Sequence, residues 1–488
     1  MVEALNKLLK GEEIAELSNI TELKQYQGKS YGGLKVVHEI AGEMGIIKAL
    51  GNSKKAKIVL MIIAGIILSR KKSKHYISEY WSRNQAIEGI LKIMDYYNED
   101  ALYDSLDWLQ ENQLKIEKKL WSLKEEDYPS PRLFLYDVTS SYVEGEHMDL
   151  TAYGYNRDGK KNKKQIVIGL LTDKKGSPVS IEVFAGNTLD YQTVSGQLEK
   201  IEKEFGVNEV VYVGDRGMIK SKQIEDIDSR KWKYITGITK PQIRKLLKDD
   251  VFQYGLFDED LCEVKEKGIR YILRRNPYRA NEIKANLEGK LQSLRDKVRK
   301  KNEYLSVSER RSAKIGLKNV NKYLEKLRLK KLVDLKVKDR RIIMEIDQEE
   351  MDEIMKLAGC YVLKTNVTAE SMKKEEVHER YRDLSKVERD FRILKTDFLD
   401  IRPIFVRKES RIRGHVFACM LALKIVRYVE RKTKKLKKPM VYIWECLNSV
   451  KYVINEFKGE TFKTLPKISN DTTKSVLKAL DITFPSKL

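Results

Sequence analysis

Cysteine and histidine are scarce in this sequence, and no apolar run is long. The four cysteines (Cys262, Cys360, Cys419 and Cys446) lie far apart without a C-x-x-C spacing, so neither a zinc ribbon nor a secreted disulfide framework is indicated. Five histidines are spread too thinly for a metal site of their own. The run from Ile58 to Leu68 is shorter than the ~20 apolar residues that span a bilayer, and we expect a buried helix there.

An export signal is also lacking. The N-terminus, MVEALNKLLKGEEIAEL, carries acidic residues early and has no cleavable apolar core of the signal-peptide type. Together with the isolated cysteines, this predicts a protein of the reducing cytoplasm.

Acidic residues are too few to balance the basic ones. Lys and Arg number 95 and Asp and Glu 72, which leaves a formal net charge of +23. Apolar residues make up 41% of the chain, enough to build sizeable cores, so a disordered or fibrous protein is a poor interpretation. The 488 residues suggest roughly three domains. The positive surplus predicts a polyanionic partner, with nucleic acid favoured over a membrane.

Apolar spacing divides the first half of the chain into a helical part and a strand-rich part. From about residue 30 to 125, apolar residues recur at helical intervals, which predicts an all-helical first part. Short runs rich in β-branched and aromatic residues follow, and we expect strands at Arg132–Val143, Gln165–Leu171, Pro178–Phe184, Glu209–Val213 and Lys233–Ile238. A helical stretch, Tyr191–Glu204, lies between the third and the fourth of them.

The second half begins with a change in composition. From Lys240 to Gly359 the chain is more basic and mainly helical, which indicates an insertion. After it we expect a strand at Tyr361–Asn366, a long helix at Glu375–Leu399, and two further helices at Arg411–Lys432 and Pro439–Phe457.

Two carboxylates stand within or at the end of apolar strands. Asp137 lies within LFLYDVTSSY, where an uncompensated carboxylate is costly, so it needs a strong partner, a bound cation or backbone donors. Asp215 ends the strand in VVYVGDRGM, and Gly217 after it permits a sharp turn. Ligands of open α/β sheets gather at such carboxyl ends of strands. The alternative for Asp215 is the N-cap of a helix that begins near Met218. Asp158, in the loop after the first strand, is expected to be a surface residue.

A third carboxylate, Glu388, lies on the expected long helix. Residues seven apart on a helix return to within about 20° of each other, so Tyr381, Glu388 and Lys395 share one face. We expect Glu388 at the edge of the buried face, although most helical glutamates lie on a solvated face. The adjoining apolar stripe consists of Leu384, Val387, Phe391 and Leu394.

Three acids of this kind suit a pair of divalent cations. Two Mg²⁺ ions ~4 Å apart activate the attacking oxygen and stabilise the leaving oxygen of a phosphodiester, provided that acidic side chains neutralise part of their charge. Hard oxygen ligands select Mg²⁺ or Mn²⁺ over zinc. The combination of Asp137, Asp215 and Glu388 therefore favours phosphodiester chemistry.

The segments around these acids resemble a known family. LYDVTSSY surrounds the first Asp and VGDRGM the second; CYVLKTN follows, then Y-x6-E-x6-K on the helix, RPI at Arg402 and IRGH ending at His415. In this order, over about residues 130 to 430, they are similar to the DDE insertion-sequence transposases, specifically the bacterial cut-and-paste group with the signature Y-x2-R-x3-E-x6-K. Leu384 stands where the signature has Arg, and Arg382 and Arg392 are the candidates for its phosphate contact.

The resemblance implies an α/β catalytic core of the RNase H-like, retroviral integrase type with an inserted subdomain, preceded by an all-helical N-terminal domain and followed by C-terminal helices. The implied segments are a helical DNA-binding domain at 1–128, catalytic parts at 129–240 and 359–430, an insertion domain at 241–358 and a helical region at 431–488. Asp137, Asp215 and Glu388 are then the catalytic residues and the ligands of two Mg²⁺ ions, for which Mn²⁺ can substitute.

Family members hydrolyse the transposon end to free a 3′ hydroxyl and use it to attack target DNA, and many excise through a hairpin. The resemblance therefore implies a transposase that acts on double-stranded DNA, as a homodimer, in the bacterial cytoplasm at the nucleoid. It places Lys395 on the DNA backbone, with Tyr381, Arg382, Arg392 and His415 as further DNA contacts. For His415, packing against the catalytic helix is an equal alternative. In the hairpin route, an aromatic side chain of the insertion domain holds a flipped base. No Trp occurs between Lys240 and Gly359, so this route stays open.

Two other functions stay open beside this one. An inactive relative that only binds DNA is disfavoured by the three intact acids. A structure-selective nuclease without strand transfer is disfavoured by the Y-x6-E-x6-K helix and the large insertion. Basic clusters such as Lys297–Lys301 and Lys326–Lys331 occur in every expected domain, and together they predict an extended phosphate-binding track.

Overall fold

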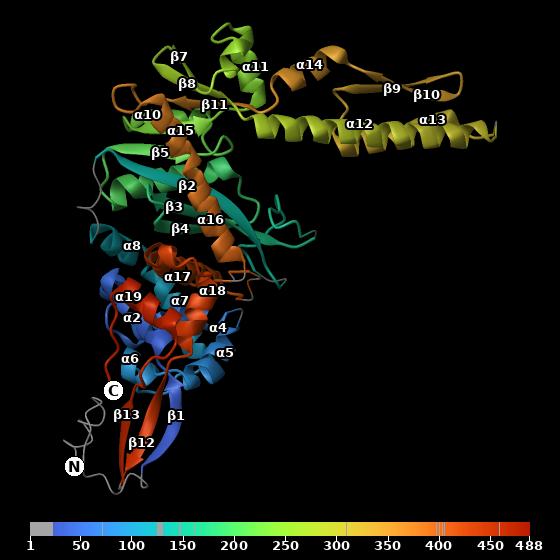
Figure 1. The fold of residues 1–488 in the computed structure, drawn as a ribbon. Helices are drawn as coiled ribbons and strands as arrows, with labels where there is room; N and C mark the ends of the chain where they lie inside the picture. Colours follow the sequence, from blue (N-terminus) through green and yellow to red (C-terminus); the bar gives the residue numbers. More distant parts are fainter. Residues whose placement is uncertain are drawn as a thin grey trace. The chain divides into compact units, whose positions relative to one another are not determined.

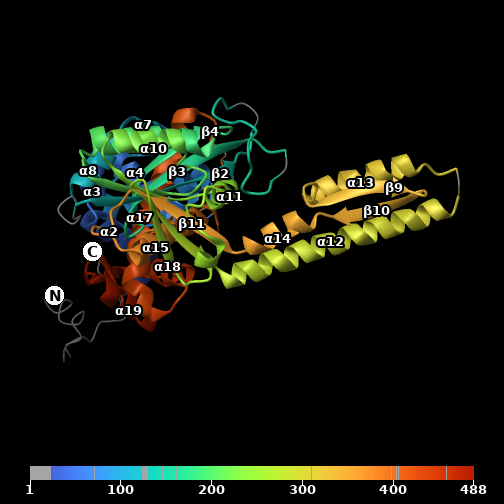
Figure 2. The same ribbon diagram turned by 90° about the horizontal axis from the view of Figure 1, so that it is seen from above.

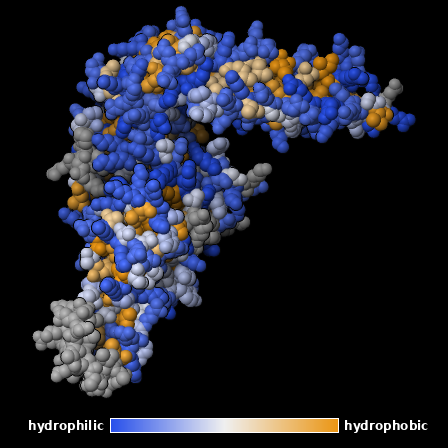
Figure 3. Space-filling view, in the orientation of Figure 1, coloured by the Kyte–Doolittle hydropathy of each residue, from blue (hydrophilic) through white to orange (hydrophobic). Residues whose placement is uncertain are grey.

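The computed structural model describes residues 23–488 apart from residues 71, 124–129, 146–147, 161, 309, 397, 400, 403, 405 and 458. The chain forms two compact units: one ends at Trp232 and resumes with Asp383–Leu488, and the other is Lys233–Arg382 (Figure 1). Both contain helices and strands, which confirms the predicted α/β class. The visible surface is predominantly hydrophilic, as the charged composition requires (Figure 3). Within the described ranges, no helix is both long enough and apolar enough to cross a membrane.

Most helices of the first unit come from the two ends of the chain. The apolar run at Ile58–Leu68 belongs to α4, which is buried on nearly all sides, as predicted, and which contacts α7 and α17. Leu102, Leu106 and Leu109 of α7 are buried, in agreement with the helical spacing. The helices are α2 (Gly32–Glu43), α3 (Ile46–Leu50), α4 (Lys54–Ser69), α5 (Lys74–Tyr76), α6 (Ile87–Leu91), α7 (Glu99–Glu111), α8 (Gln113–Ser122), α9 (Val194–Glu199), α10 (Ser221–Ser229), α16 (Leu384–Lys395), α17 (Glu409–Thr433), α18 (Met440–Asn448) and α19 (Asp471–Leu480).

The first unit also contains four strands in the order β4-β3-β2-β5. They are β2 (Arg132–Tyr142), β3 (Gln165–Asp173), β4 (Pro178–Ala185) and β5 (Val210–Gly214), close to their predicted bounds. β2 and β3 are antiparallel, as are β3 and β4, whereas β5 runs parallel to β2 with Tyr136 opposite Gly214. Every residue of β3 is buried, and β3 pairs with β2 on one edge and with β4 on the other. Helices pack on both neighbours, since α16 contacts β2 and α17 contacts β4 (Figure 1).

A separate three-stranded sheet corrects two predictions. It has the order β1-β12-β13 and joins β1 (Lys24–Ser30) to β12 (Lys451–Phe457) and β13 (Glu460–Thr464). The N-terminal part is therefore not all-helical, and the predicted helix at Pro439–Phe457 ends at Asn448, where α18 ends. Long-range backbone pairing overrides the local helical pattern, since β12 is hydrogen-bonded on both edges. At Gly28, an added Cβ would lie 2.2 Å from the ring of Tyr452, so this pairing requires glycine there.

The predicted helix at Glu375–Leu399 is also corrected. It is two helices, α15 (Lys374–Arg382) and α16, with Asp383 between them. At the junction the amide of Lys386 donates to the carbonyl of Asp383 at 2.9 Å, a tighter turn than in an α-helix, and the Lys386 Nζ lies 2.8 Å from the Asp383 carboxylate. The face predicted to carry Tyr381, Glu388 and Lys395 is therefore interrupted.

The second unit has its own strands, in the order β6-β11-β8-β7 and all antiparallel where paired. They are β6 (Lys233–Gly237), β7 (Cys262–Glu266), β8 (Ile269–Arg275) and β11 (Cys360–Thr365), which confirms the predicted strand at Tyr361–Asn366. The remaining elements are α11 (Lys240–Lys248), α12 (Pro277–Ser306), α13 (Ala313–Leu327), β9 (Val333–Lys338), β10 (Arg341–Ile346), α14 (Gln348–Lys356) and α15. The unit thus holds the predicted insertion together with β6 before it and β11 and α15 after it.

Candidate active site

Asp137 occupies the middle of β2 and is half-buried. Its Oδ1 accepts a hydrogen bond from the amide of Val138 at 2.8 Å. Burial raises the pKa of Asp137 from 3.8 to about 7; the Val138 hydrogen bond opposes this rise, and the negative charges of Asp215 and Glu388 add to it. A positively charged neighbour, Arg157, lowers the pKa. The carboxyl of Asp137 is therefore poised between its two protonation states near neutral pH.

Asp215 directly follows β5, and the parallel register of β2 and β5 brings it beside Asp137. Its side chain is exposed and its Oδ1 accepts from the amide of Arg216 at 2.7 Å, while its carbonyl accepts from the amide of Met218 at 2.9 Å. The next helix, α10, begins only at Ser221 after Lys220. The alternative that Asp215 caps a helix near Met218 is therefore wrong.

Glu388 lies on α16, which packs against β2 through the predicted stripe of Leu384, Val387, Phe391 and Leu394. All four of these residues are buried and Glu388 is exposed, so the helix presents it beside the packed face. Its charge raises the pKa of Asp137, as does that of Asp215. The first unit thus brings the three predicted carboxylates into one electrostatic neighbourhood.

The fit of these acids to divalent cations follows from their chemistry. Three carboxylates provide the hard oxygen donors that Mg²⁺ and Mn²⁺ prefer. The negative charges of Asp215 and Glu388 repel the ionised Asp137 and raise its pKa, and a bound cation would cancel that repulsion. In the part of the chain that the structure describes, however, no group of three His, Cys, Asp or Glu side chains converges closely enough to hold a metal. The donor set fits the cations, and its side chains must converge to bind them.

Asp158 corrects the expectation of a surface residue. Its side chain is only 2% exposed, and its Oδ1 accepts from Nζ of Lys395 at 2.9 Å and forms an ion pair with Arg402. Its Oδ2 accepts from the amide of Tyr142, at the end of β2, at 3.1 Å. One buried carboxylate therefore joins the strand that carries Asp137 to the end of the helix that carries Glu388.

The residue before it, Arg157, connects the loop to the same strand. Its amide donates to Oγ of Ser140 at 2.9 Å, and its guanidinium holds both carboxylate oxygens of Asp190 at 2.6 and 2.7 Å. Arg157 also lowers the pKa of Asp137. Sequence reasoning missed Arg157 and Asp158, because their partners are distant in the chain.

The predicted DNA contacts fall into different environments. Arg392 is exposed on α16, and Lys395 is largely buried, with a pKa lowered by burial against the opposing effect of Asp158. Tyr381 and Arg382 belong to the second unit, where Tyr381 is half-buried and Arg382 exposed.

His415 is a correction to the predicted DNA contacts. It is 8% exposed, and both its ring nitrogens lie within 3.9 Å of the Cys419 sulfur on the next turn of α17. Burial lowers its pKa well below 6.5. A buried neutral imidazole is a packing residue. Its contact here is with its own helix, and the alternative of packing against the catalytic helix stays a prediction.

A second missed acid is Asp390, which is fully buried on α16. Its Oδ1 lies 3.0 Å from Nε of Arg427 in α17, and burial raises its pKa to about 7 against the opposing effect of that arginine. The sequence spacing indicated this burial, since Asp390 is three residues after Val387 and four before Leu394 and so lies on the apolar face of the helix.

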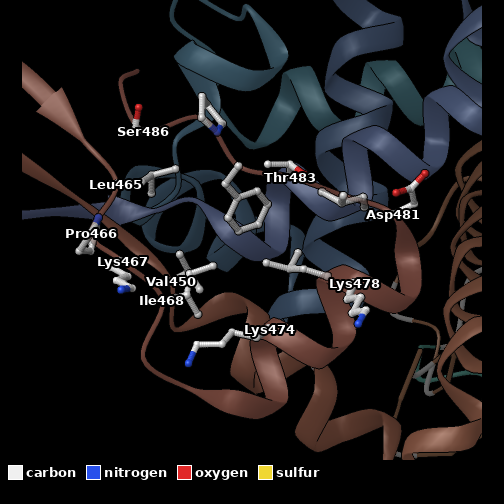
Figure 4. A pocket seen from close by; sticks show the side chains of 14 residues that line it. Val450, Leu465, Pro466, Lys467, Ile468, Lys474, Lys478, Asp481, Thr483 and Ser486 are labelled. Atoms are coloured by element: carbon white, nitrogen blue, oxygen red, sulfur yellow. The ribbon is translucent and has the colours of Figure 1, made fainter. Parts of the chain in front are cut away.

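The first unit also has an apolar cavity that plays no part in this site. It has a volume of about 640 Å³ and lies among C-terminal residues such as Val450, Leu465 and Phe484 (Figure 4). Lys474, Lys478 and Asp481 line it as well, but Asp137, Asp215 and Glu388 do not.

Residues 128–425 match the family model described as the transposase DDE domain. The chain belongs to this family. The matched DDE domain includes Asp137, Asp215 and Glu388 as well as Asp158, Lys395 and Arg402. No curated protein matches the chain significantly. Among solved structures, it is similar to the cryo-EM structure of the piggyBac transposase synaptic complex with hairpin DNA, at 9% identity and a TM-score of 0.39, over 85% of this chain and 78% of that chain. The assignment to the DDE family rests on the sequence match.

Proposed function

We propose that this protein is a metal-dependent DNA transposase that binds the ends of an insertion sequence, cleaves phosphodiester bonds there and joins the 3′ ends to target DNA. The supporting observation is the raised pKa of Asp137, to which both Asp215 and Glu388 contribute, in a chain that carries the transposase DDE domain. An RNase H-like core is supported by the antiparallel pairing of β2, β3 and β4 together with the parallel pairing of β5 with β2. The bacterial cytoplasm and a homodimer on paired DNA ends are parts of the same proposal.

Asp137, Asp215 and Glu388 would hold two divalent cations. When bound, Mg²⁺ ions activate the attacking oxygen and stabilise the leaving oxygen of a phosphodiester. Asp137 must lose its proton to become a ligand, and its pKa of about 7 makes that loss easy at neutral pH. The three side chains must converge to hold the cations, because they form no metal-binding group in the described structure. Arg392, which is exposed on the same helix as Glu388, would hold a DNA phosphate. Lys395 would hold another only after leaving its partner Asp158.

One observation favours a second function. Because the carboxylates do not converge, a relative that binds DNA without cutting it fits the structure as well. The experiment that separates the two mixes the full-length protein with the DNA that flanks its own gene and Mg²⁺, and looks for nicked or excised ends. Cleavage supports the transposase, and end binding without cleavage at any metal or salt concentration supports the binding-only protein.

The individual acids are tested in the same assay. Asp137→Asn, Asp215→Asn and Glu388→Gln should each abolish cleavage and leave end binding largely intact. Glu199→Gln, an exposed carboxylate of the same unit that pairs with Lys203, is the matched control and should cut normally. Near-normal cutting by any of the three variants removes that residue from the site.

A further inference from the structure

The second unit contains an arm that carries much of the positive charge of the chain. We define the arm as residues 277–346, that is α12, α13 and the β9–β10 hairpin, which lie side by side (Figure 2). It contains 21 Lys and Arg residues but nine Asp and Glu residues, a surplus of 12 in a chain whose net charge is +23. About half of the positive surplus is thus concentrated in 70 of the 488 residues.

The arm has an apolar core of its own. Leucines of α12 pack with Val320 and Leu324 of α13 and with Val333, Leu335 and Ile342 of the hairpin. On α13 the fully buried residues are Gly316, Val320 and Leu324, which share one face. Packing therefore occupies that face of α13 and leaves the opposite face to solvent.

Four lysines follow one another along that solvent face. Lys314, Lys318, Lys322 and Lys326 recur at every fourth residue, and all are exposed. With 3.6 residues per turn, they fall within an arc of about 120° over about 18 Å of helix, centred opposite the buried residues. We call these four residues the lysine stripe.

Helix stability does not explain the lysine stripe. Like charges four residues apart destabilise a helix by a few tenths of a kcal/mol per pair. In the described part of the chain, no acid forms an ion pair with any of the four, and the single acid of α13, Glu325, pairs instead with Lys330 at 3.4 Å. Lys297 of α12 lies over the ring of Tyr323 at 5.8 Å and adds a further ammonium group beside α13. This concentration of like charge calls for an anionic partner.

We propose that the lysine stripe binds the phosphates of a DNA duplex without reading its sequence. A duplex offers one negative charge per ~1.7 Å of axis, enough for every lysine of an 18 Å row. A membrane fits less well, because an interfacial helix needs an apolar face, and that of α13 is buried in the core of the arm. Ile315, 63% exposed, is the one large exposed apolar residue of α13, whose residues are all described. This binding surface does not depend on the proposed cleavage and holds for a binding-only protein as well.

The test measures how the affinity of full-length protein for a random-sequence 30-base-pair duplex depends on salt, without Mg²⁺. A variant with all four stripe lysines changed to Gln should bind at least about tenfold more weakly near 0.15 M salt. Its slope of log K against log salt should be less steep by up to about 3.6, which is 0.9 per lost phosphate contact. The same four positions changed to Arg should restore binding, since charge is what the lysine stripe supplies.

The matched control removes four other positive charges. Lys54, Lys118, Lys203 and Lys474 are partly exposed and already paired with acids at 3.3, 3.0, 2.6 and 2.9 Å. Their change to Gln lowers the net charge equally, but the slope of log K against log salt should change by less than about 0.9, the value for one lost phosphate contact. Equal slopes in the wild type and the stripe variant, or equal losses in the stripe and control variants, overturn the proposal. It is also overturned if the stripe variant loses binding to phosphatidylserine vesicles and keeps its affinity for DNA.

Discussion

Nζ of Lys395 donates a hydrogen bond to Oδ1 of Asp158 at 2.9 Å, although 237 residues separate them in the chain. The same oxygen forms the ion pair with Arg402, whose Nε donates to the carbonyl of Lys395 at 2.9 Å. One protein carboxylate therefore holds both Arg402 and Lys395, the residue that the resemblance assigns to a DNA phosphate. When that carboxylate is absent, both cations lose their partner in a largely buried place.

Asp158→Ala should accordingly destabilise the protein strongly. Removing one partner of a buried ion pair costs about 3 to 5 kcal/mol, because the remaining charge is uncompensated. Thermal unfolding of the full chain measures the loss, and Asp149→Ala, an exposed acid of the same loop region, should leave the melting temperature almost unchanged. Equal melting temperatures for the two variants would show that the Asp158 pair does not stabilise the fold.

The stability of the metal-free protein should fall as the pH rises from 5 to 8. The pKa of Asp137 is about 7 in the fold and about 3.9 in an unfolded chain, so the fold binds the proton more tightly. The stabilising contribution is complete below pH 4 and is lost as the pH passes 7. Its upper limit is about 4 kcal/mol, and solvent around this half-buried carboxyl reduces it. Asp137→Asn should reduce the dependence and leave the part that Asp390 contributes, since burial raises the pKa of Asp390 to about 7 as well. Unfolding in urea at pH 5, 6, 7 and 8 measures the difference.

Mg²⁺ should reverse that loss. A cation that binds the three carboxylates favours their ionised forms, so the melting temperature at pH 8 should rise with Mg²⁺ and fall again with EDTA. Asp137→Asn should show little of this rise. A rise of the same size in the variant would place the bound Mg²⁺ elsewhere in the protein.

Much of the fold was predictable because local sequence determined it. The strand runs β2 to β6 are apolar and β-branched, and α4 is apolar on all sides, so each could be recognised without its partners. The pairing of β1 with β12 could not, because its register joins Lys24 to Glu456 across almost the whole chain. The candidate site shows the same division. Asp137, Asp215 and Glu388 stood out by position, whereas the burial of Asp158 depends on Lys395 and Arg402.

Arg427→Met should destabilise the protein in a pH-dependent way. Arg427 compensates the charge of the fully buried Asp390. Burial raises the pKa of Asp390 to about 7, so Asp390 is ionised at pH 8 and is then uncompensated without the arginine. At pH 8 the expected loss is about 3 kcal/mol, and at pH 5 it should be smaller because Asp390 is then protonated. Arg83→Met, which breaks an exposed pair with Glu79, should cost little at either pH. A loss that is equal at both pH values would show that lost packing, and not the charge of Asp390, is responsible.

Gly28→Ala should destabilise the β1-β12-β13 sheet. The added Cβ would lie 2.2 Å from two ring atoms of Tyr452 and 2.8 Å from its carbonyl oxygen, so ring and backbone must both move. Such overpacking costs typically about 1 to 3 kcal/mol. Gly89→Ala is the control, since an added Cβ there meets nothing within 4 Å and alanine suits helix α6 better than glycine. Tyr452→Ala removes the ring contact but not the backbone contact. Gly28→Ala should therefore cost less stability when it is added to Tyr452→Ala than when it is added to the wild type. If Gly28→Ala melts like the wild type, the close approach of β1 and β12 at this position is not as the structure has it.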